Sequence, residues 1–200
     1  MIVLEPVIGR GTLKVGPIPT FSLPSRFSCP GASPWCVKHC YAARFERVWP
    51  NCRVAYSRNL VLSWNAPRFV GAMLRCIPRD LPYLRIHVSG DFQSGVYADS
   101  WLQIVQKRPH CQFFAYTRSW NVPSILPALE RLRALENCHL LASVDPDMPD
   151  PPPGWRVAYL DIDPRAQGVP CLHQHGQAKS CHECRYCFRP GKGNVVFTVH

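Results

Sequence analysis

The sequence lacks any long apolar segment. No run of apolar residues reaches the roughly 18 residues that a membrane-spanning helix needs. The first residues, MIVLEPVIGRGTLKVG, also lack a basic start followed by a long apolar stretch, which is the pattern of a secretory signal peptide. We therefore expect a cytoplasmic protein with no membrane partner, in a compartment where cysteines stay reduced.

Acidic residues and lysines are scarce. The chain has 13 Asp and Glu against 23 Lys and Arg, which gives a net charge of +10, and only five of the basic residues are lysines. The planar fork of arginine suits phosphate and carboxylate groups. A nucleic acid or another anionic substrate is therefore one candidate partner, and a basic surface without a specific polyanion is the alternative.

The order of the apolar segments predicts an α/β fold. No internal repeat is present, and segments with strand character alternate with segments of helical periodicity. Strands are expected within 18–24, 83–92, 111–120, 139–145, 156–163 and 194–200, and helices at 53–76 (broken near Pro67, with Asn65 as a cap), 97–105 and 122–135. A complete eight-stranded β/α barrel typically takes about 250 residues. We therefore predict an open, partial β/α barrel of five to six mostly parallel strands.

Two parts of the chain are expected to differ in role. Residues 1–164 would form the partial barrel, with a three-cysteine loop near its N-terminus. Residues 165–200 would form a cysteine-rich, cluster-binding C-terminal segment and the last strand. Within the first part, the stretch DPDMPDPPPGW (145–155) is predicted to be a loop or linker, because its prolines oppose both helix and central strand.

Small and polar residues follow four of the predicted strands. They are Ser89, Gly90 and Asp91 after one strand, Arg118 with residues 117 and 119 after the next, Ser143 and Asp145 at the end of a third, and Asp161 and Asp163 at the end of a fourth. Ligands of parallel α/β sheets gather at the carboxyl ends of the strands, so these residues are candidates for a binding site. Such residues are also favoured in ordinary turns and helix caps, which is the alternative reading.

The first cysteine group is the stretch SCPGASPWCVKHCYAARF. Cys29, Cys36 and Cys40 have the spacing C-x6-C-x3-C. Three thiolates can hold three irons of a [4Fe-4S] cluster and leave the fourth iron open to a substrate or cofactor. Zinc is the competing ion, with His39 as a fourth ligand.

The second group lies in CLHQHGQAKSCHECRYCF. Cys171, Cys181, Cys184 and Cys187 have the spacing C-x9-C-x2-C-x2-C. Four thiolates complete a closed site, and the C-x2-C-x2-C run is typical of ferredoxin cluster loops. We predict a second [4Fe-4S] cluster here, with zinc as the alternative. Nearby histidines could replace a cysteine, and the four other cysteines read as ordinary thiols: His173, His175, His182; Cys52, Cys76, Cys111, Cys138.

Several motifs together carry a resemblance. The segments GPIPTFSLPSRFSCPGASPWCVKHCYAA, HVSGDF, FAYTRSW and SCHECRYCF resemble a family of phage-encoded "gene product" proteins, over nearly the whole chain. A three-cysteine loop after the first strand of a partial β/α barrel is also distantly similar to the radical S-adenosylmethionine superfamily. That likeness implies that Cys29, Cys36 and Cys40 hold a cluster whose open iron binds S-adenosylmethionine.

The superfamily likeness also implies roles for the polar residues. Residues 89–91 would match the motif that contacts the amino group of the cofactor, with Asp91 as the acceptor. Residues 142–145 would match a strand end that helps to hold the ribose and carboxylate, and Arg118 could receive a carboxylate or phosphate. One-electron reduction by a donor partner would then cleave the cofactor into an adenosyl radical that attacks a nucleotide, nucleic acid or protein. The alternative is a non-catalytic iron–sulfur or zinc protein that binds nucleic acid or a protein partner.

Overall fold

The computed structural model describes residues 4–199, and their strands form one mixed α/β sheet. Its eight strands follow the order β1-β2-β3-β4-β5-β6-β8-β7, and every neighbouring pair is parallel except β1 with β2. The strands are β1 (Ile8–Gly9), β2 (Thr20–Phe21), β3 (Tyr83–Ile86), β4 (Gln112–Thr117), β5 (Cys138–Ser143), β6 (Arg156–Leu160), β7 (Val169–Pro170) and β8 (Val195–Phe197).

The prediction of an open, mostly parallel sheet is confirmed, with more strands than the expected five to six. The additional strands β1 and β7 have two residues each, too few to show a period in the sequence. They lie at the two ends of the strand order, so the described sheet is not closed. The curvature of a barrel stays a prediction, as does the division at residue 164, although β8 joins the sheet by pairing with β6.

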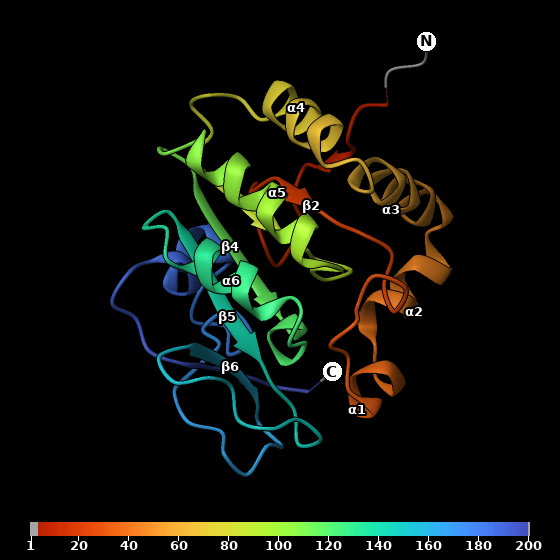
Figure 1. The fold of residues 1–200 in the computed structure, drawn as a ribbon. Coiled ribbons are helices and arrows are strands. Elements are labelled where there is room, and N and C mark those ends of the chain that lie inside the picture. Colours follow the sequence, from red (N-terminus) through yellow and green to blue (C-terminus); the bar gives the residue numbers. More distant parts are fainter. Residues whose placement is uncertain (1–3, 200) are drawn as a thin grey trace.

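The helices connect the strands, and those between residues 50 and 133 cover one face of the sheet. The helices are α1 (Pro34–Lys38), α2 (Tyr41–Val48), α3 (Pro50–Ser63), α4 (Ala66–Cys76), α5 (Gly95–Gln106), α6 (Leu126–Arg133) and α7 (Cys181–Cys184), with the short 3-10 turns η1 (Ser119–Asn121) and η2 (Tyr186–Phe188). Because most strands follow one another in order and such crossovers share one hand, successive helices fall on the same face. Figure 1 shows α5 and α6 in front of β4 and β5.

Helix boundaries follow local sequence signals. The expected break near Pro67 is present: α3 ends at Ser63, and Asn65 caps α4 by accepting a hydrogen bond from the Arg68 N–H (3.1 Å). The helix expected at 122–135 is shorter, since 122–125 form a turn and α6 begins at Leu126. Of the strand expected at 194–200, Val195–Phe197 is observed, and residue 200 lies outside the described residues.

The sheet has a different cover on each face. Phe113 and Ala115 of β4 join the main core beneath the helices, whereas Phe114 belongs to a second core on the other face. There Phe188 of η2 stacks on Phe114, with ring centres 4.5 Å apart. The cysteine-rich C-terminal segment therefore covers the face that α5 and α6 leave open. No helix within residues 4–199 is long and apolar enough to cross a membrane.

Candidate functional site

The three-cysteine loop follows β2 and owes its shape to two helix starts. Ser33 caps α1, because its Oγ accepts a hydrogen bond from the Cys36 N–H (3.0 Å), and a proline occupies the first turn of that helix. Cys40 caps α2, because its Sγ accepts a hydrogen bond from the Ala43 N–H (3.4 Å). The Cys40 sulfur therefore lies at the positive end of α2, where negative charge is stabilised.

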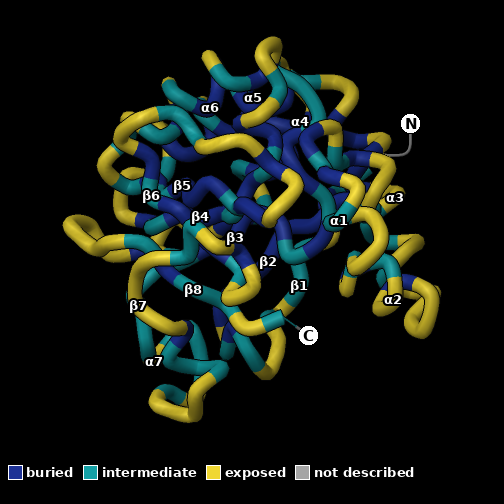
Figure 2. Tube along the Cα trace, turned by 90° about the horizontal axis from the view of Figure 1, so that it is seen from below, coloured by how far each residue is buried: buried dark blue, intermediate teal, exposed yellow. Residues whose placement is uncertain are grey.

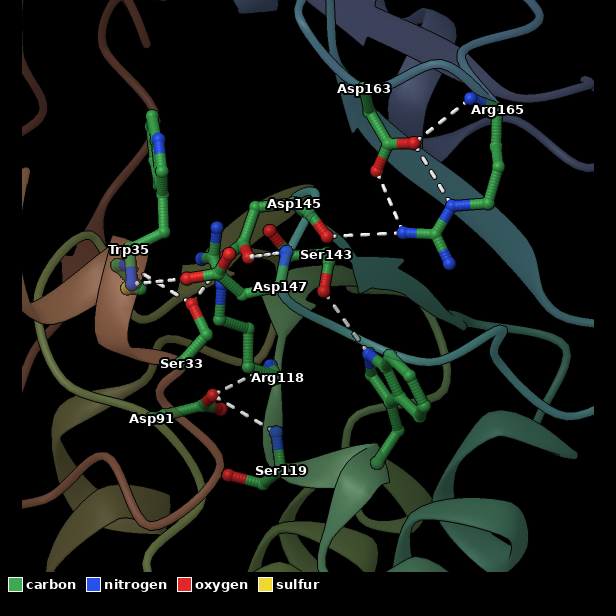
Figure 3. Close-up of polar contacts among 12 residues, drawn as sticks. Ser33, Trp35, Asp91, Arg118, Ser119, Ser143, Asp145, Asp147, Asp163 and Arg165 are labelled. Carbon is green, nitrogen blue, oxygen red and sulfur yellow. Dashed lines mark hydrogen bonds and ion pairs between the residues drawn. The ribbon is translucent and has the colours of Figure 1, made fainter.

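The loop is fixed to the carboxyl ends of β4 and β5, as Figure 3 shows. The Ser33 hydroxyl donates to Asp145 Oδ2 (2.8 Å), and the Trp35 N–H donates to Asp147 Oδ2 (3.0 Å). Gly31 packs against the end of β4 so closely that a Cβ there would lie 2.2 Å from the Arg118 carbonyl oxygen. The predicted gathering of the cysteine loop and polar strand ends at one edge is therefore observed.

Asp91 ties the end of β3 to the end of β4. One carboxylate oxygen accepts from Thr117 Oγ1 (2.6 Å) and the Phe92 N–H (2.7 Å), and the other accepts from the Arg118 N–H (2.7 Å) and the Ser119 N–H (3.2 Å). Burial raises the pKa of Asp91, and these hydrogen bonds oppose that rise. A carboxylate has about four acceptor sites. All are filled from within the protein, so an ammonium group of a cofactor would have to displace one of these donors.

Arg118 is the predicted binding residue with donors to spare. Its Nε donates to Asp145 Oδ2 (3.2 Å), while among the described residues its two terminal nitrogens have no hydrogen-bond partner. Burial raises the pKa of Cys36, and the charge of Arg118 opposes this rise. Burial and the nearby charge of Asp91 raise the pKa of Cys29 to about 12. The structure thus places Arg118 near the cysteine loop with part of its guanidinium available to an anion.

Ser89, Gly90 and Ser143 contact other parts of the protein at the strand ends. The Ser89 hydroxyl donates to Glu46 Oε1 (2.5 Å), and the Ser143 carbonyl accepts from Trp120 Nε1 (3.2 Å). Gly90 has φ +78°, and a Cβ on it would lie 2.6 Å from both the Leu23 Cβ and Ser28 Oγ. The space beside Gly90 is therefore filled by the protein itself.

Gly90→Ala should destabilise the fold by about 3 kcal/mol, since it combines a left-handed backbone with overpacking. Gly154→Ala is the matched control, because Gly154 has φ +81° but nothing within 4 Å of its added Cβ; it should cost only about 1 kcal/mol. Urea unfolding of both variants measures the difference. Equal losses would show that the space beside Gly90 is open.

The C-terminal cysteines line one pocket. Cys171, Cys181, Cys184 and Cys187 surround it together with aromatic residues of the sheet and tail: Tyr116, Tyr186, Phe188, Phe197. Ser180 caps α7, and Arg185, at φ +56°, reverses the chain so that η2 returns Cys187 to the pocket. The Cys181 N–H donates to the Lys14 carbonyl (2.8 Å), which joins the tail to the N-terminal segment.

Two cations near this pocket lack an acidic partner. Arg85 of β3 is buried; its Nε donates to the His87 carbonyl (3.3 Å), and its guanidinium lies 5.2 Å from the Tyr116 ring centre. Lys14 is half-buried, with its Nζ 4.8 Å from the Phe197 ring centre. Within the described part of the chain, neither forms an ion pair with a carboxylate. Burial raises the pKa of Cys181, and both cations oppose that rise. Because buried charges are normally paired, this donor set fits an anionic thiolate centre.

The geometry does not by itself assemble a single-ion site. Across residues 4–199, no group of three or more His, Cys, Asp or Glu side chains is arranged to hold a metal ion. A [4Fe-4S] cluster spreads its thiolates over four irons. The proposed zinc ligand His39 is exposed and stacks on Trp35, and His173 Nδ1 lies 3.3 Å from the Ala178 carbonyl. The metal assignment of both cysteine groups thus stays a prediction.

Comparison with known proteins identifies the family. The model of the family "Gene product 88" matches residues 8–190, which include both cysteine groups. The chain belongs to the gene product 88 family. The Gene 88 protein of Mycobacterium phage L5 is 31% identical, over 94% of this chain and 90% of its own length, and that of Mycobacterium phage D29 is 30% identical over the same shares. The predicted phage gene-product family is confirmed. No solved structure matches the chain.

Sequence reasoning about this gene product 88 member missed five residues near the sites: Lys14, Ser33, Glu46, Arg85 and Asp147. Ser33 had a local signal, because Ser before Pro is typical of a helix start. Glu46 had a weaker one, as the only acidic residue between Glu5 and Asp80. Lys14 and Arg85 had none, since their role depends on contacts with a distant part of the chain.

Proposed function

We propose that this gene product 88 protein is an iron–sulfur protein with two [4Fe-4S] clusters, one open and one closed, and that it acts as a radical S-adenosylmethionine-like enzyme. The observation that carries the proposal is the C-terminal pocket. Four thiols share it, and the nearby Arg85 and Lys14 have no acidic partner among the described residues. A cluster with four thiolates would supply the missing negative charge.

The closed site would be structural. Cys171, Cys181, Cys184 and Cys187 would take every protein-ligand position of a cluster. Cys171 follows β7, Cys181 and Cys184 lie on α7, and Cys187 lies in η2. These short elements contain little hydrophobic core of their own. Metal binding energy at such a site is folding energy, so the cluster would fix the tail onto the sheet.

The open site would be the catalytic one. Cys29, Cys36 and Cys40 would hold its cluster at the carboxyl edge of the sheet, and this group supplies one-electron chemistry when bound. Arg118 would bind a carboxylate or phosphate of the cofactor or substrate through its spare nitrogens, while Asp145 orients the guanidinium. Asp91 would position the strand ends, and Ser33 would hold the loop through Asp145. An electron donor is then a required partner.

A non-catalytic iron–sulfur or zinc protein is the second candidate. It is favoured by Asp91, whose acceptor sites are filled by the protein's own donors. A binding module needs the cysteine sites only for stability, and it needs no free acceptor for a cofactor's amino group.

Metal analysis after anaerobic purification tests the proposal. The protein should be brown and contain about eight irons and eight sulfides per chain, by the stoichiometry of two four-iron clusters. Quantification of iron, sulfide and zinc, with the visible absorption spectrum, makes this measurement. A colourless protein that takes up zinc and no iron after anaerobic reconstitution would rule out the iron–sulfur assignment.

A further inference from the structure

The positive charge is concentrated on one part of the structure. Residues 26–68 contain seven basic residues, all exposed, and one acidic residue, Glu46, which is buried. The basic residues are Arg26, Lys38, Arg44, Arg47, Arg53, Arg58 and Arg68. Figure 2 shows α2 and the start of α3 projecting from the body of the molecule, largely exposed. We call this region, residues 41–64, the α2–α3 arm.

A groove at the base of the arm gathers three arginines. Arg26, Arg47 and Arg53 line it together with Ser25, Ala43, Glu46 and Pro50. Ala43, Glu46 and Arg47 follow the i, i+3, i+4 spacing that places residues on one side of α2, and Pro50 begins α3. Arg53 comes from the first turn of α3, and Arg26 is held from the loop after β2 by donating to the Val37 carbonyl (2.9 Å). Three separate segments therefore bring guanidinium groups to one groove.

The groove contains little negative charge that could pair with these arginines. Glu46 is directed inward, where its Oε1 accepts from the Ser25 N–H (2.9 Å) and the Ser89 hydroxyl (2.5 Å). Neither Arg47 nor Arg53 forms an ion pair with any residue that the structure describes. Like charges held together without a partner repel one another, and an anion relieves this repulsion. Guanidinium groups bind phosphate through bidentate hydrogen bonds, so the groove is suited to a phosphate group.

The other residues of the arm indicate that its ligand carries several phosphates in a row and has unpaired bases. Arg44 and Arg58 of the arm, and Arg68 of the following helix α4, extend the positive charge beyond the groove, which a single small anion would not require. On another side of α2, Phe45 and Trp49 are about half exposed, with their ring centres 6.3 Å apart, and Trp64 is exposed at the end of α3. Proteins that bind single strands combine a basic groove with aromatic side chains on which bases stack.

We propose that the α2–α3 arm binds single-stranded nucleic acid and that the groove of Arg26, Arg47 and Arg53 holds a backbone phosphate. The inference goes beyond the proposed function, because the binding surface does not depend on either cluster. It would also bring a nucleic-acid strand next to the three-cysteine loop, since Ser25 and Arg26 precede Cys29 and α2 follows Cys40. If the open site is catalytic, nucleic acid is then its substrate class.

Fluorescence anisotropy with labelled 20-nucleotide single strands, DNA and RNA, tests the proposal with the full chain. Arg47→Ala/Arg53→Ala should weaken binding at least tenfold at moderate salt. It should also lower the slope of log affinity against log salt by about 0.7, as expected for one lost phosphate contact on a single strand. Phe45→Ala should weaken single-strand binding about tenfold and leave duplex binding unchanged.

The matched control is Arg79→Ala/Lys107→Ala. It removes the same charge from exposed residues that precede β3 and β4, at the opposite edge of the sheet. Circular dichroism and metal content of each variant show that fold and clusters are intact, so loss of binding can be told apart from loss of the sites. If both double variants weaken binding equally, the loss would be explained by net charge alone, and the proposal that the groove binds the phosphate would be wrong. If the protein binds vesicles that contain phosphatidylserine and does not bind single strands, the proposal is wrong, and the partner of the arm is a membrane surface instead of nucleic acid.

Discussion

Replacing Cys187 by Ser should remove one cluster and destabilise the whole fold. Cys187 lies in the pocket shared by the four C-terminal cysteines, and burial raises the pKa of its thiol to about 12. A serine there would leave only three cysteine ligands beside Lys14 and Arg85, which form no ion pair with the carboxylates that the structure describes. Iron content should fall from about eight to about four. The free energy of unfolding should fall by about 3 kcal/mol or more, because the proposed cluster would fix the tail to the sheet.

Iron analysis and urea unfolding under anaerobic conditions measure both effects. Cys52→Ser is the control, because Cys52 is also partly buried but belongs to neither cysteine group. It should retain all iron and nearly full stability. A Cys187→Ser protein with unchanged iron and stability would show that the four C-terminal thiols do not form one site.

The fold was predictable where the sequence pattern is local. The longer parallel strands β4, β5 and β6 carry apolar residues on both faces, and the break before α4 follows from Asn65 and Pro67. The two-residue strands β1 and β7 were not predictable, because their pairing depends on neighbouring strands and not on their own periodicity. Likewise α6 is shorter than its apolar repeat, since the turn containing Pro123 precedes it.

The candidate sites were predictable in place but not in detail. Parallel strands end at one edge, so the gathering of Asp91, Arg118 and Asp145 near the cysteine loop followed from their positions after strands. Which acceptors remain free did not follow, because the donors to Asp91 come mostly from the next strand. The joint groove of Arg26, Arg47 and Arg53 did not follow either, because these residues come from three separate segments that only the fold brings together.

The hydrogen bonds already made by each polar residue near the three-cysteine loop determine whether it can also bind a ligand. Asp91 is committed to four internal donors, so its replacement should disturb the strand ends before it affects any ligand. Among the described residues, the Arg118 side chain is hydrogen-bonded through Nε alone, so its terminal nitrogens are available to an anion. Arg118 is therefore the sharper probe of cofactor binding.

Adding S-adenosylmethionine to the anaerobic, reduced protein should change the electron paramagnetic resonance spectrum of the open cluster and release 5′-deoxyadenosine slowly. Arg118→Ala should raise the cofactor concentration needed for this response about tenfold, because a charged hydrogen bond contributes about 1.5–3 kcal/mol to binding. Its iron content should stay at about eight, since Cys29, Cys36 and Cys40 remain. Arg131→Ala, which removes an exposed arginine paired with Asp99 on α5, should respond like the unchanged protein. A spectrum of the unchanged protein that does not respond to the cofactor would remove the radical-enzyme proposal. The cysteine sites would then belong to a binding module, and the α2–α3 arm would carry its function.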